Sequence, residues 1–251
     1  MNPRGKQVVV MGLGRFGGGL GVTQWLLEQG AKVLLTDLAS EDELSEQLSQ
    51  LGTHPNLTVV CGSHPEHAFK SADMVIANPA IPAPWNNPFL RVAWDAGVEV
   101  TTEIHLVVHQ LDRLKVIGVT GTAGKSTTAA MIHAALVGSD FIAHLGGNIG
   151  GSLLDQISSF NSNDIVVLEL SSAMLWWLDE GSKKGWSPHI AVLTNIEPNH
   201  IDWHGSFRAY KDCKRAIFKY QIDGDTALVQ DPCATFDDLS VQGKHNERNA
   251  S

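Results

Sequence analysis

Short apolar runs alternate with amphipathic stretches over the first hundred residues. The runs are rich in β-branched residues and predict buried strands, whereas the stretches between them repeat apolar residues three or four apart, as helices do. Strands that alternate with helices form βαβ units, so we expect a parallel sheet. The predicted strands are 7–11, 32–36, 57–61, 74–76 and 98–101, and the predicted helices are 20–29, 41–50 and 89–96.

The alternation then restarts. Strands are predicted at 115–120, 165–168 and 189–193, and helices at 127–136 and 207–218. We therefore predict an α/β protein in which residues 1–111 form a Rossmann-like domain and residues 112–251 form a P-loop-type α/β domain. The last residues, 243–251, resemble the opening of another helix, so we expect the second domain to be incomplete in this chain.

Composition narrows the class of protein. The chain has 251 residues, is 43% hydrophobic, and has 27 acidic against 18 basic residues, which is typical of a soluble globular protein with no affinity for nucleic acid or anionic membrane. No apolar run is long enough for a signal peptide or a membrane span. The three cysteines show no CxxC spacing, so neither a disulfide framework nor a zinc site is predicted. We expect a cytoplasmic protein.

A glycine-rich turn follows the first predicted strand and opens the next helix. In dinucleotide-binding folds such a turn brings backbone N–H groups close to a diphosphate, and an acid about twenty residues further on binds a ribose hydroxyl. The pattern fits NAD as well as a UDP-sugar, and a tight turn without any ligand is the plain alternative. The candidate substrate-binding residues are Gly12, Gly14, Arg15, Phe16, Gly17 and Asp37.

A second glycine-rich turn joins the strand at 115–120 to the helix at 127–136. Its sequence, T-G-T-A-G-K-S-T, resembles a P-loop, although Val119 stands where the strict pattern has glycine. In such a loop backbone N–H groups hold phosphates, Lys125 reaches the β- and γ-phosphates of ATP, and a hydroxyl binds Mg²⁺. Helix capping alone would not require the lysine. The candidate nucleotide-binding residues are Gly121, Thr122, Gly124, Lys125, Ser126 and Thr127.

Polar residues follow the next two predicted strands. Glu169 ends the strand at 165–168, where a nucleotide-bound metal in the same sheet needs a carboxylate, although surface acids are also common there. His200 is either a metal ligand, better suited to Mn²⁺ than to Mg²⁺, or a solvated loop histidine. Lys211 and Lys214 lie on the last predicted helix, and residue chemistry alone predicts that both are solvated.

These elements, in this order, resemble the Mur ligase family over essentially the whole chain. Within the family, the G-L-G-R-F-G turn with Asp37 and the loop at 77–82 are similar to the members that add D-glutamate. The most specific segments are the T-G-T-A-G-K-S-T loop, G-N-I-G at 147–150, E-L-S-S at 169–172, residues 195–204, Y-K-D-C-K at 210–214 and G-K-H-N-E-R-N at 243–249.

The resemblance implies a fold of three domains, and the C-terminal domain with the amino-acid site is missing from this chain. It implies a monomeric ligase of peptidoglycan precursor synthesis that uses ATP and Mg²⁺, with Mn²⁺ as an option at the second metal site. The carboxylate of UDP-N-acetylmuramoyl-L-alanine would form an acyl phosphate, and D-glutamate would then displace phosphate. We expect this chain alone to form no amide.

The resemblance also implies residue roles. Lys125, His200 and Lys214 are catalytic, Ser126 and Glu169 hold one metal ion, and His200 and Lys214 hold another. Lys214 would carry a carbamate, because an ammonium group with a pKa near 10.4 is neutral in only roughly one molecule in 2,000 at pH 7 and cannot ligate a cation. By the same resemblance, Asn148 and Ser171 contact the substrate or the metal shell. Asn246 and Asn249 match positions near the adenine.

Some positions depart from the family pattern. Ala123 replaces an asparagine in the phosphate loop, Ala173 and Met174 replace a Phe-Gln pair, and Ala80 replaces a glycine. These departures bear on substrate details and not on the use of ATP. Two alternatives stay open at this point: the L-alanine-adding ligase of the same family, and an NAD- or nucleotide-binding module without ligase activity.

Overall fold

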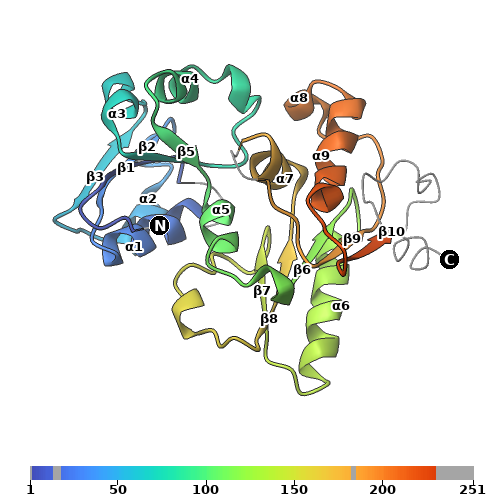
Figure 1. Ribbon diagram of the computed structural model, residues 1–251. Helices are drawn as coiled ribbons and strands as arrows, with labels where there is room; N and C mark the ends of the chain where they lie inside the picture. The colour runs from blue at the N-terminus through green and yellow to red at the C-terminus, as the bar shows by residue number, and fades with distance from the viewer. Residues whose placement is uncertain (1, 14–17, 182–184, 230–251) are drawn as a thin grey trace. The chain divides into compact units, whose positions relative to one another are not determined.

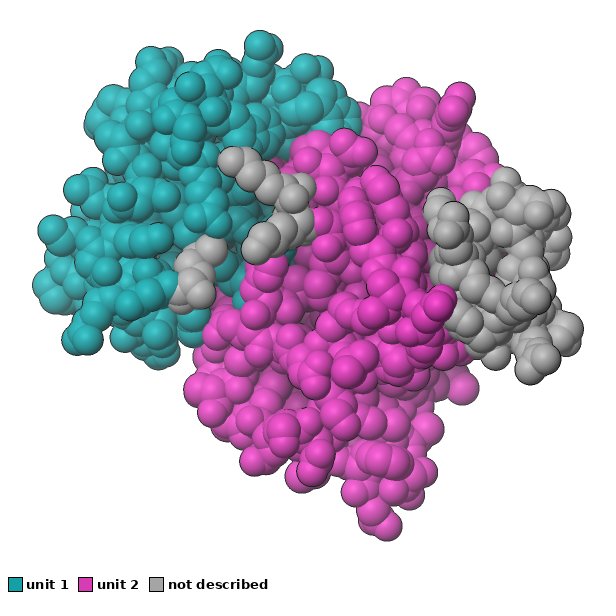
Figure 2. Space-filling view, in the orientation of Figure 1, with its two compact units in different colours: residues 1–106 teal, residues 107–251 magenta. Residues whose placement is uncertain are grey.

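The computed structural model describes residues 2–13, 18–181 and 185–229. The chain forms two compact units, Met1–Leu106 and Val107–Ser251, which Figure 2 colours separately. The sequence pattern predicts the division between residues 111 and 112. Each unit contains a parallel sheet flanked by helices, so the predicted α/β fold with two parallel sheets is confirmed.

The first unit is built on a five-stranded parallel sheet with the order β3-β2-β1-β4-β5 (Figure 1). Four of the five residues of the central strand β1 are buried, because a parallel sheet is covered on both faces, and this accounts for its continuous apolar run. The strands are β1 (Gln7–Met11), β2 (Lys32–Asp37), β3 (Leu57–Cys61), β4 (Met74–Ala77) and β5 (Glu99–Thr101). The helices are α1 (Gly18–Glu28), α2 (Ser45–Leu51), α3 (Glu66–Ser71) and α4 (Pro88–Asp95), with the 3₁₀ turn η1 (Pro84–Asn86). The division between the units falls within helix α5 (Glu103–Val108).

The second unit is built on a second five-stranded parallel sheet, with the order β10-β9-β6-β8-β7. Its strands are β6 (Val116–Thr120), β7 (Ala143–Gly147), β8 (Ile165–Glu169), β9 (Ile190–Leu193) and β10 (Thr226–Val229). Its helices are α6 (Lys125–Val137), α7 (Ser172–Asp179), α8 (Ile201–His204) and α9 (Phe207–Lys219), with the 3₁₀ turns η2 (Arg113–Lys115) and η3 (Ile157–Ser159).

Helices α6 and α9 cover opposite faces of this sheet. Val119 of β6 packs with Ala129 of α6, whereas a side chain at Gly118 would meet Ile217 of α9. Successive residues of a strand point to opposite faces, so one helix lies on each side of β6. The strand that leads into the second glycine-rich turn is therefore packed from both sides.

The sequence did not predict several elements. Strand β7 reads Ala-His-Leu-Gly-Gly and lies at the sheet edge, where two glycines weaken the strand pattern. Helix α7 is apolar around most of its surface, so it shows no helical alternation of polar and apolar residues. Helices α3, α5 and α8 and strand β10 have six residues or fewer, too short for a periodic signal. Within the described part of the chain, no helix has the length and apolar character needed to cross a membrane.

A buried carboxylate ties the amino-terminal ends of strands in the second unit together. Asp225 is 3% exposed and accepts hydrogen bonds from Arg113 Nη1 at 2.6 Å, His189 Nδ1 at 2.8 Å and the backbone N–H of Ile222 at 2.8 Å. Burial raises the pKa of Asp225, but the hydrogen bonds from Arg113, Ile222 and His189 outweigh burial and hold that pKa below its ordinary value. The folded state therefore favours the ionised carboxylate.

We expect Asp225→Asn to lower the free energy of unfolding by about 3 kcal/mol at pH 7, because Arg113 would lose a buried charged partner. A carboxyl group with a depressed pKa stabilises the fold above its unfolded-state pKa and loses that effect as the pH falls through the folded-state pKa. The difference in the free energy of unfolding between wild type and variant should thus shrink below about pH 4. Urea unfolding at pH 7 and pH 3.5 measures this difference at each pH.

Asp212→Asn is the matched control. Its carboxylate lies 3.9 Å from Arg208 in an exposed pair, which contributes little to stability. An Asp225→Asn variant as stable as the Asp212→Asn variant at pH 7 would contradict this account of the network.

Candidate active site at the carboxyl ends of the strands

The loop between β6 and α6 has the geometry of a phosphate loop. Gly121 and Gly124 have φ angles of 153° and 80°, a region that favours glycine, and a Cβ atom at Gly121 would lie 1.9 Å from Thr194 Oγ1. No side chain caps the first turn of α6, which leaves its N–H groups directed at the space before the helix. Ser126 and Thr127 are exposed in that turn. Together with the helix dipole, these donors can bind an anion.

Lys125 is the first residue of α6 and adds a positive charge to this loop. Its Nζ donates a hydrogen bond to the carbonyl of Thr122 at 3.1 Å, so the ammonium group lies back over the turn. The ammonium group is therefore placed where phosphates on the helix N-terminus would meet it.

Glu169 is the last residue of β8, next to β6 in the sheet, and its side chain is buried with 1% exposure. Asn148, the residue after β7, holds it: the Asn148 N–H donates to the Glu169 carbonyl at 2.8 Å, and Asn148 Nδ2 donates to Oε1 at 3.1 Å. The other carboxylate oxygen, Oε2, is buried without a hydrogen-bond partner among the described residues. A buried oxygen of this kind fits a hard cation such as Mg²⁺.

Lys214 is buried, and the sequence-based expectation that it is solvated is wrong. It lies on α9 with 1% exposure, and its Nζ donates to the carbonyl of Gly121 at 2.7 Å and lies 4.8 Å from the centre of the Tyr210 ring. Burial and the neighbouring Lys125 charge lower the pKa of Lys214 from 10.5 to about 7, against the opposing effects of Cys213 and Glu169. The neutral amine of Lys214 is therefore far more accessible near pH 7 than that of a solvated lysine.

Two histidines follow β9 and differ in environment. His200 is exposed, has a left-handed backbone conformation with φ of 49°, and its ring centre lies 6.3 Å from that of Tyr210. His204 is buried, and its Nε2 lies 2.9 Å from Ser172 Oγ. Burial, followed by the charges of His200 and Lys214, lowers the pKa of His204 to about 4, so this ring is neutral at pH 7. Only His200 is free to present its ring to solvent or a ligand.

Ser171 has a structural role. Its hydroxyl caps α7 by accepting a hydrogen bond from the N–H of Met174 at 3.1 Å. Among residues 2–13, 18–181 and 185–229, no three His, Cys, Asp or Glu side chains form a metal-binding group. The predicted metal ligands include only two residues of these types, Glu169 and His200.

Tyr210 and Asn195 hold the phosphate loop, a role that the sequence did not predict for them. Thr122 Oγ1 lies 2.9 Å from the hydroxyl of Tyr210, and Asn195 pairs with the backbone of Ala123. Tyr210 precedes Lys214 by one helical turn, which is a signal that the two share the buried face of α9. Asn195 follows a predicted strand of the same sheet as the phosphate loop. This position is a weaker signal that Asn195 lies near that loop.

Asp37 contacts the start of the first glycine-rich turn, at Leu13. Asp37 Oδ2 accepts a hydrogen bond from the N–H of Leu13 at 2.8 Å, and Oδ1 accepts one from the N–H of Ala39 at 2.9 Å. Gly12 has a φ of 90°, and a Cβ atom there would lie 3.3 Å from Asn78 Cβ. Both Asp37 oxygens thus accept hydrogen bonds from backbone N–H groups. The predicted contacts at Gly14, Arg15, Phe16, Gly17, Asn246 and Asn249 lie outside the described residues.

Comparison with protein families decides where the chain belongs. Residues 119–250, more than half of the chain, match the Mur ligase middle domain. The chain belongs to the Mur ligase family. Residues 6–102 match the N-terminal domain of MurD-like Mur ligases.

Two curated relatives of this Mur ligase chain carry the same name. A protein of a Roseiflexus species, named UDP-N-acetylmuramoylalanine–D-glutamate ligase, is 39% identical over 229 residues, which cover 91% of this chain and 48% of the relative. A Geobacter metallireducens protein of the same name is 35% identical, over 92% of this chain and 49% of the relative. The Mur ligase chain therefore spans about half the length of these relatives.

Solved structures show the same fold. UDP-N-acetylmuramate:L-alanyl-γ-D-glutamyl-meso-diaminopimelate ligase of Neisseria meningitides has a TM-score of 0.58 and 22% identity, and the match covers 90% of this chain and 71% of that one. UDP-N-acetylmuramate–alanine ligase of Thermotoga maritima has a TM-score of 0.51 and 22% identity. The match covers 89% of this chain and 49% of that one. At these identities the likeness concerns the fold alone.

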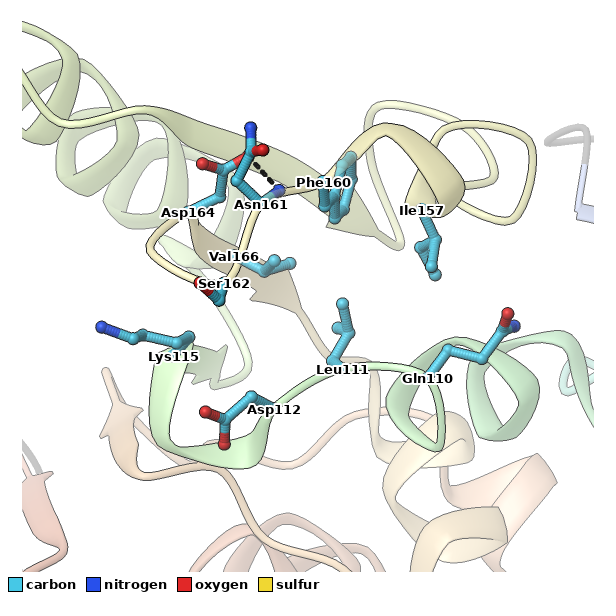
Figure 3. Close-up of a pocket in the computed structure, with 10 residues that line it drawn as sticks. All are labelled: Gln110, Leu111, Asp112, Lys115, Ile157, Phe160, Asn161, Ser162, Asp164 and Val166. Carbon is cyan, nitrogen blue, oxygen red and sulfur yellow. Dashed lines mark hydrogen bonds between the residues drawn. The ribbon is translucent and has the colours of Figure 1, made fainter.

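A cavity of about 160 Å³ lies elsewhere in the second unit of the Mur ligase chain, and Figure 3 shows its lining. Asp164 accepts hydrogen bonds there from His144 Nε2 at 2.9 Å and the N–H of Asn161 at 3.1 Å. Lys115 precedes β6 and Val166 is near the start of β8, so the cavity lies at the opposite end of these strands from the phosphate loop. It contributes no residue to the candidate active site.

Proposed function

We propose that the full-length protein is an ATP-dependent ligase that joins D-glutamate to UDP-N-acetylmuramoyl-L-alanine, a step of peptidoglycan precursor synthesis in the cytoplasm, and that it acts as a monomer. One observation carries the proposal: at the end of β8, beside β6, a buried Glu169 oxygen has no hydrogen-bond partner among the described residues, and the buried amine of Lys214 donates to Gly121 of the phosphate loop. The names of the curated relatives support the choice of substrates.

The two units would bind different ligands. The turn after β1, with Gly12 and Asp37, would bind the UDP-substrate, in the domain we place at residues 1–111. The phosphate loop and Lys125 would bind ATP, in the domain at 112–251, with Asn246 and Asn249 near the adenine. Asn148 and Ser171 would contact the substrate or the metal shell.

Mg²⁺ fits the donor set of this site. Ser126 and Glu169 would hold one ion, while His200 and a carbamate on Lys214 would hold a second, at which Mn²⁺ is an alternative. When bound, the metal supplies positive charge that offsets the charge of the phosphates. Asn148 orients the Glu169 carboxylate, and burial lowers the pKa of Lys214 to about 7 and so favours its neutral amine.

The proposed reaction has two transfers. A carboxylate oxygen of the UDP-substrate attacks the γ-phosphorus of ATP, the bond to the bridging oxygen breaks, and ADP leaves an acyl phosphate. The amine of D-glutamate then attacks the acyl carbon, loses a proton, and displaces phosphate to form the amide. Lys125 would stabilise the charge on the transferring phosphoryl group. Water must be excluded throughout, because it would hydrolyse the acyl phosphate.

Binding of the UDP-substrate tests the first half of this assignment. We expect UDP-N-acetylmuramoyl-L-alanine, at about a hundredfold above its Kd, to raise the thermal midpoint by about 5 °C or more, because it binds only the folded state. NAD should cause no shift. Differential scanning fluorimetry measures both.

UDP and uridine serve as a matched pair of control ligands. UDP should raise the thermal midpoint by part of the amount seen with the UDP-substrate, and uridine should raise it less than UDP does, because the turn after β1 would bind a diphosphate. Stabilisation by NAD alone, with none by the UDP compounds, would show that the chain is an NAD-binding module and not a ligase.

A further inference from the structure

The segment after β9 holds the phosphate loop in place. We call residues 194–197 the β9 loop. Its backbone and side chains make reciprocal hydrogen bonds with the loop after β6: the N–H of Thr122 donates to the carbonyl of Asn195 at 2.9 Å, and Thr194 Oγ1 donates to the carbonyl of Ala123 at 2.7 Å. The N–H of Glu197 donates to Thr122 Oγ1 at 2.9 Å. The two loops are about seventy residues apart in sequence but form one hydrogen-bonded unit.

Asn195 makes the most specific of these contacts. Its Oδ1 accepts from the N–H of Ala123 at 2.9 Å, and its Nδ2 donates to the carbonyl of the same residue at 3.0 Å. A single side-chain amide therefore satisfies both backbone groups of Ala123. Among the side chains of this size only an amide carries both a donor and an acceptor in one plane, so neither leucine nor alanine can replace it.

The phosphate loop needs such an external support. Two of its residues, Gly121 and Gly124, lack side chains and adopt positive φ angles, so the backbone has little intrinsic preference for this shape. Ala123 between them is exposed and has no polar side chain of its own. The anion-binding N–H groups of residues 124–127 follow directly, and their direction depends on the backbone at Ala123.

We infer that Asn195 is a positioning residue for ATP, which fixes the phosphate loop in its anion-binding shape through Ala123. A loop already in its binding shape loses less conformational entropy when a polyphosphate binds, so affinity rises without an added contact. The inference rests on the proposed function only in taking an adenine nucleotide as the ligand.

The test is calorimetric titration of the full-length protein with Mg·ADP and, separately, with UDP. Asn195→Ala removes the two hydrogen bonds between the Asn195 side chain and Ala123 but leaves the one from Thr194 Oγ1, and Asn195→Leu removes the same two at nearly constant side-chain volume. We expect both variants to bind Mg·ADP about tenfold or more weakly and to bind UDP as the wild type does. Asn163→Ala, in an exposed turn before β8, is the matched control and should bind both ligands normally.

Each other outcome contradicts the inference. Wild-type affinity for Mg·ADP in both variants would show that the loop keeps its shape without Asn195. An equal loss of Mg·ADP and UDP affinity, accompanied by a lower thermal midpoint, would assign Asn195 to general stability. A wild-type protein that binds UDP but no Mg·ADP would overturn the proposed function itself, and the inference with it.

Discussion

Replacing Lys125 by alanine in the full-length protein should reduce ATP-dependent turnover by about 10²–10³-fold. Lys125 starts α6 with its ammonium group over the phosphate loop, 3.1 Å from the carbonyl of Thr122. There it would offset charge that develops on the transferring phosphoryl group, and water cannot replace it in a closed site. Steady-state release of ADP in the presence of UDP-N-acetylmuramoyl-L-alanine and D-glutamate measures the effect.

Lys115 provides the matched control. It stands directly before β6, whereas Lys125 follows the same strand, so the two lysines lie at opposite ends of one element. Lys115→Ala should leave turnover unchanged, and affinity for UDP should be normal in both variants. Ordinary turnover in Lys125→Ala would show that the loop is a helix-capping turn and not an ATP site.

A second large loss is expected for Lys214→Ala, about a hundredfold or more in turnover. Burial and the Lys125 charge lower the pKa of the Lys214 amine to about 7, which makes its neutral, nucleophilic form accessible near pH 7. Its nitrogen lone pair can attack the carbon of CO₂, one C=O electron pair moves to oxygen, and the nitrogen releases a proton. The product is a carbamate, whose anionic oxygen can ligate a cation where an ammonium group cannot.

Chemical rescue distinguishes the carbamate from a structural lysine. Acetate or formate should restore part of the activity of Lys214→Ala by filling the anionic site, whereas chloride should not. Lys211→Ala, one turn earlier on α9, is the matched control and should be active without rescue. Wild-type activity should also fall when CO₂ and bicarbonate are removed, and should rise with pH through about 7 as the amine loses its proton. A fully active Lys214→Ala variant with no bicarbonate dependence would rule the carbamate out.

The parallel sheets could be predicted because their central strands are locally distinctive. Both β1 and β6 are apolar runs that end in a glycine-rich turn before a helix, so the pattern marks strand, turn and helix together. The edge strand β7 could not be predicted in this way, since its Gly146 and Gly147 are needed for close packing. A Cβ atom at Gly147 would lie 2.2 Å from the Glu169 carbonyl. Here a tertiary contact overrides strand propensity.

The candidate site could be located from the sequence more easily than its electrostatics. The sequence places Lys125 after β6 and Glu169 at the end of β8, and parallel strands bring both to one edge of the sheet. The burial of Lys214 depends on how α9 packs over Gly121, a contact between residues 93 apart. The pairing of Asn195 with Ala123 likewise depends on the approach of two loops. Residue types alone carry no information on such distances.

One measurement tests the central proposal most directly. The full-length protein is incubated with UDP-N-acetylmuramoyl-L-alanine, ATP, Mg²⁺ and D-[¹⁴C]glutamate, and a parallel sample receives UDP-N-acetylmuramate and L-[¹⁴C]alanine. We predict a labelled UDP-dipeptide product in the first sample, formed with one ADP per amide, and no labelled product in the second. Labelled product only in the second sample, or label incorporated without ATP, would contradict the assignment as a D-glutamate-adding ligase.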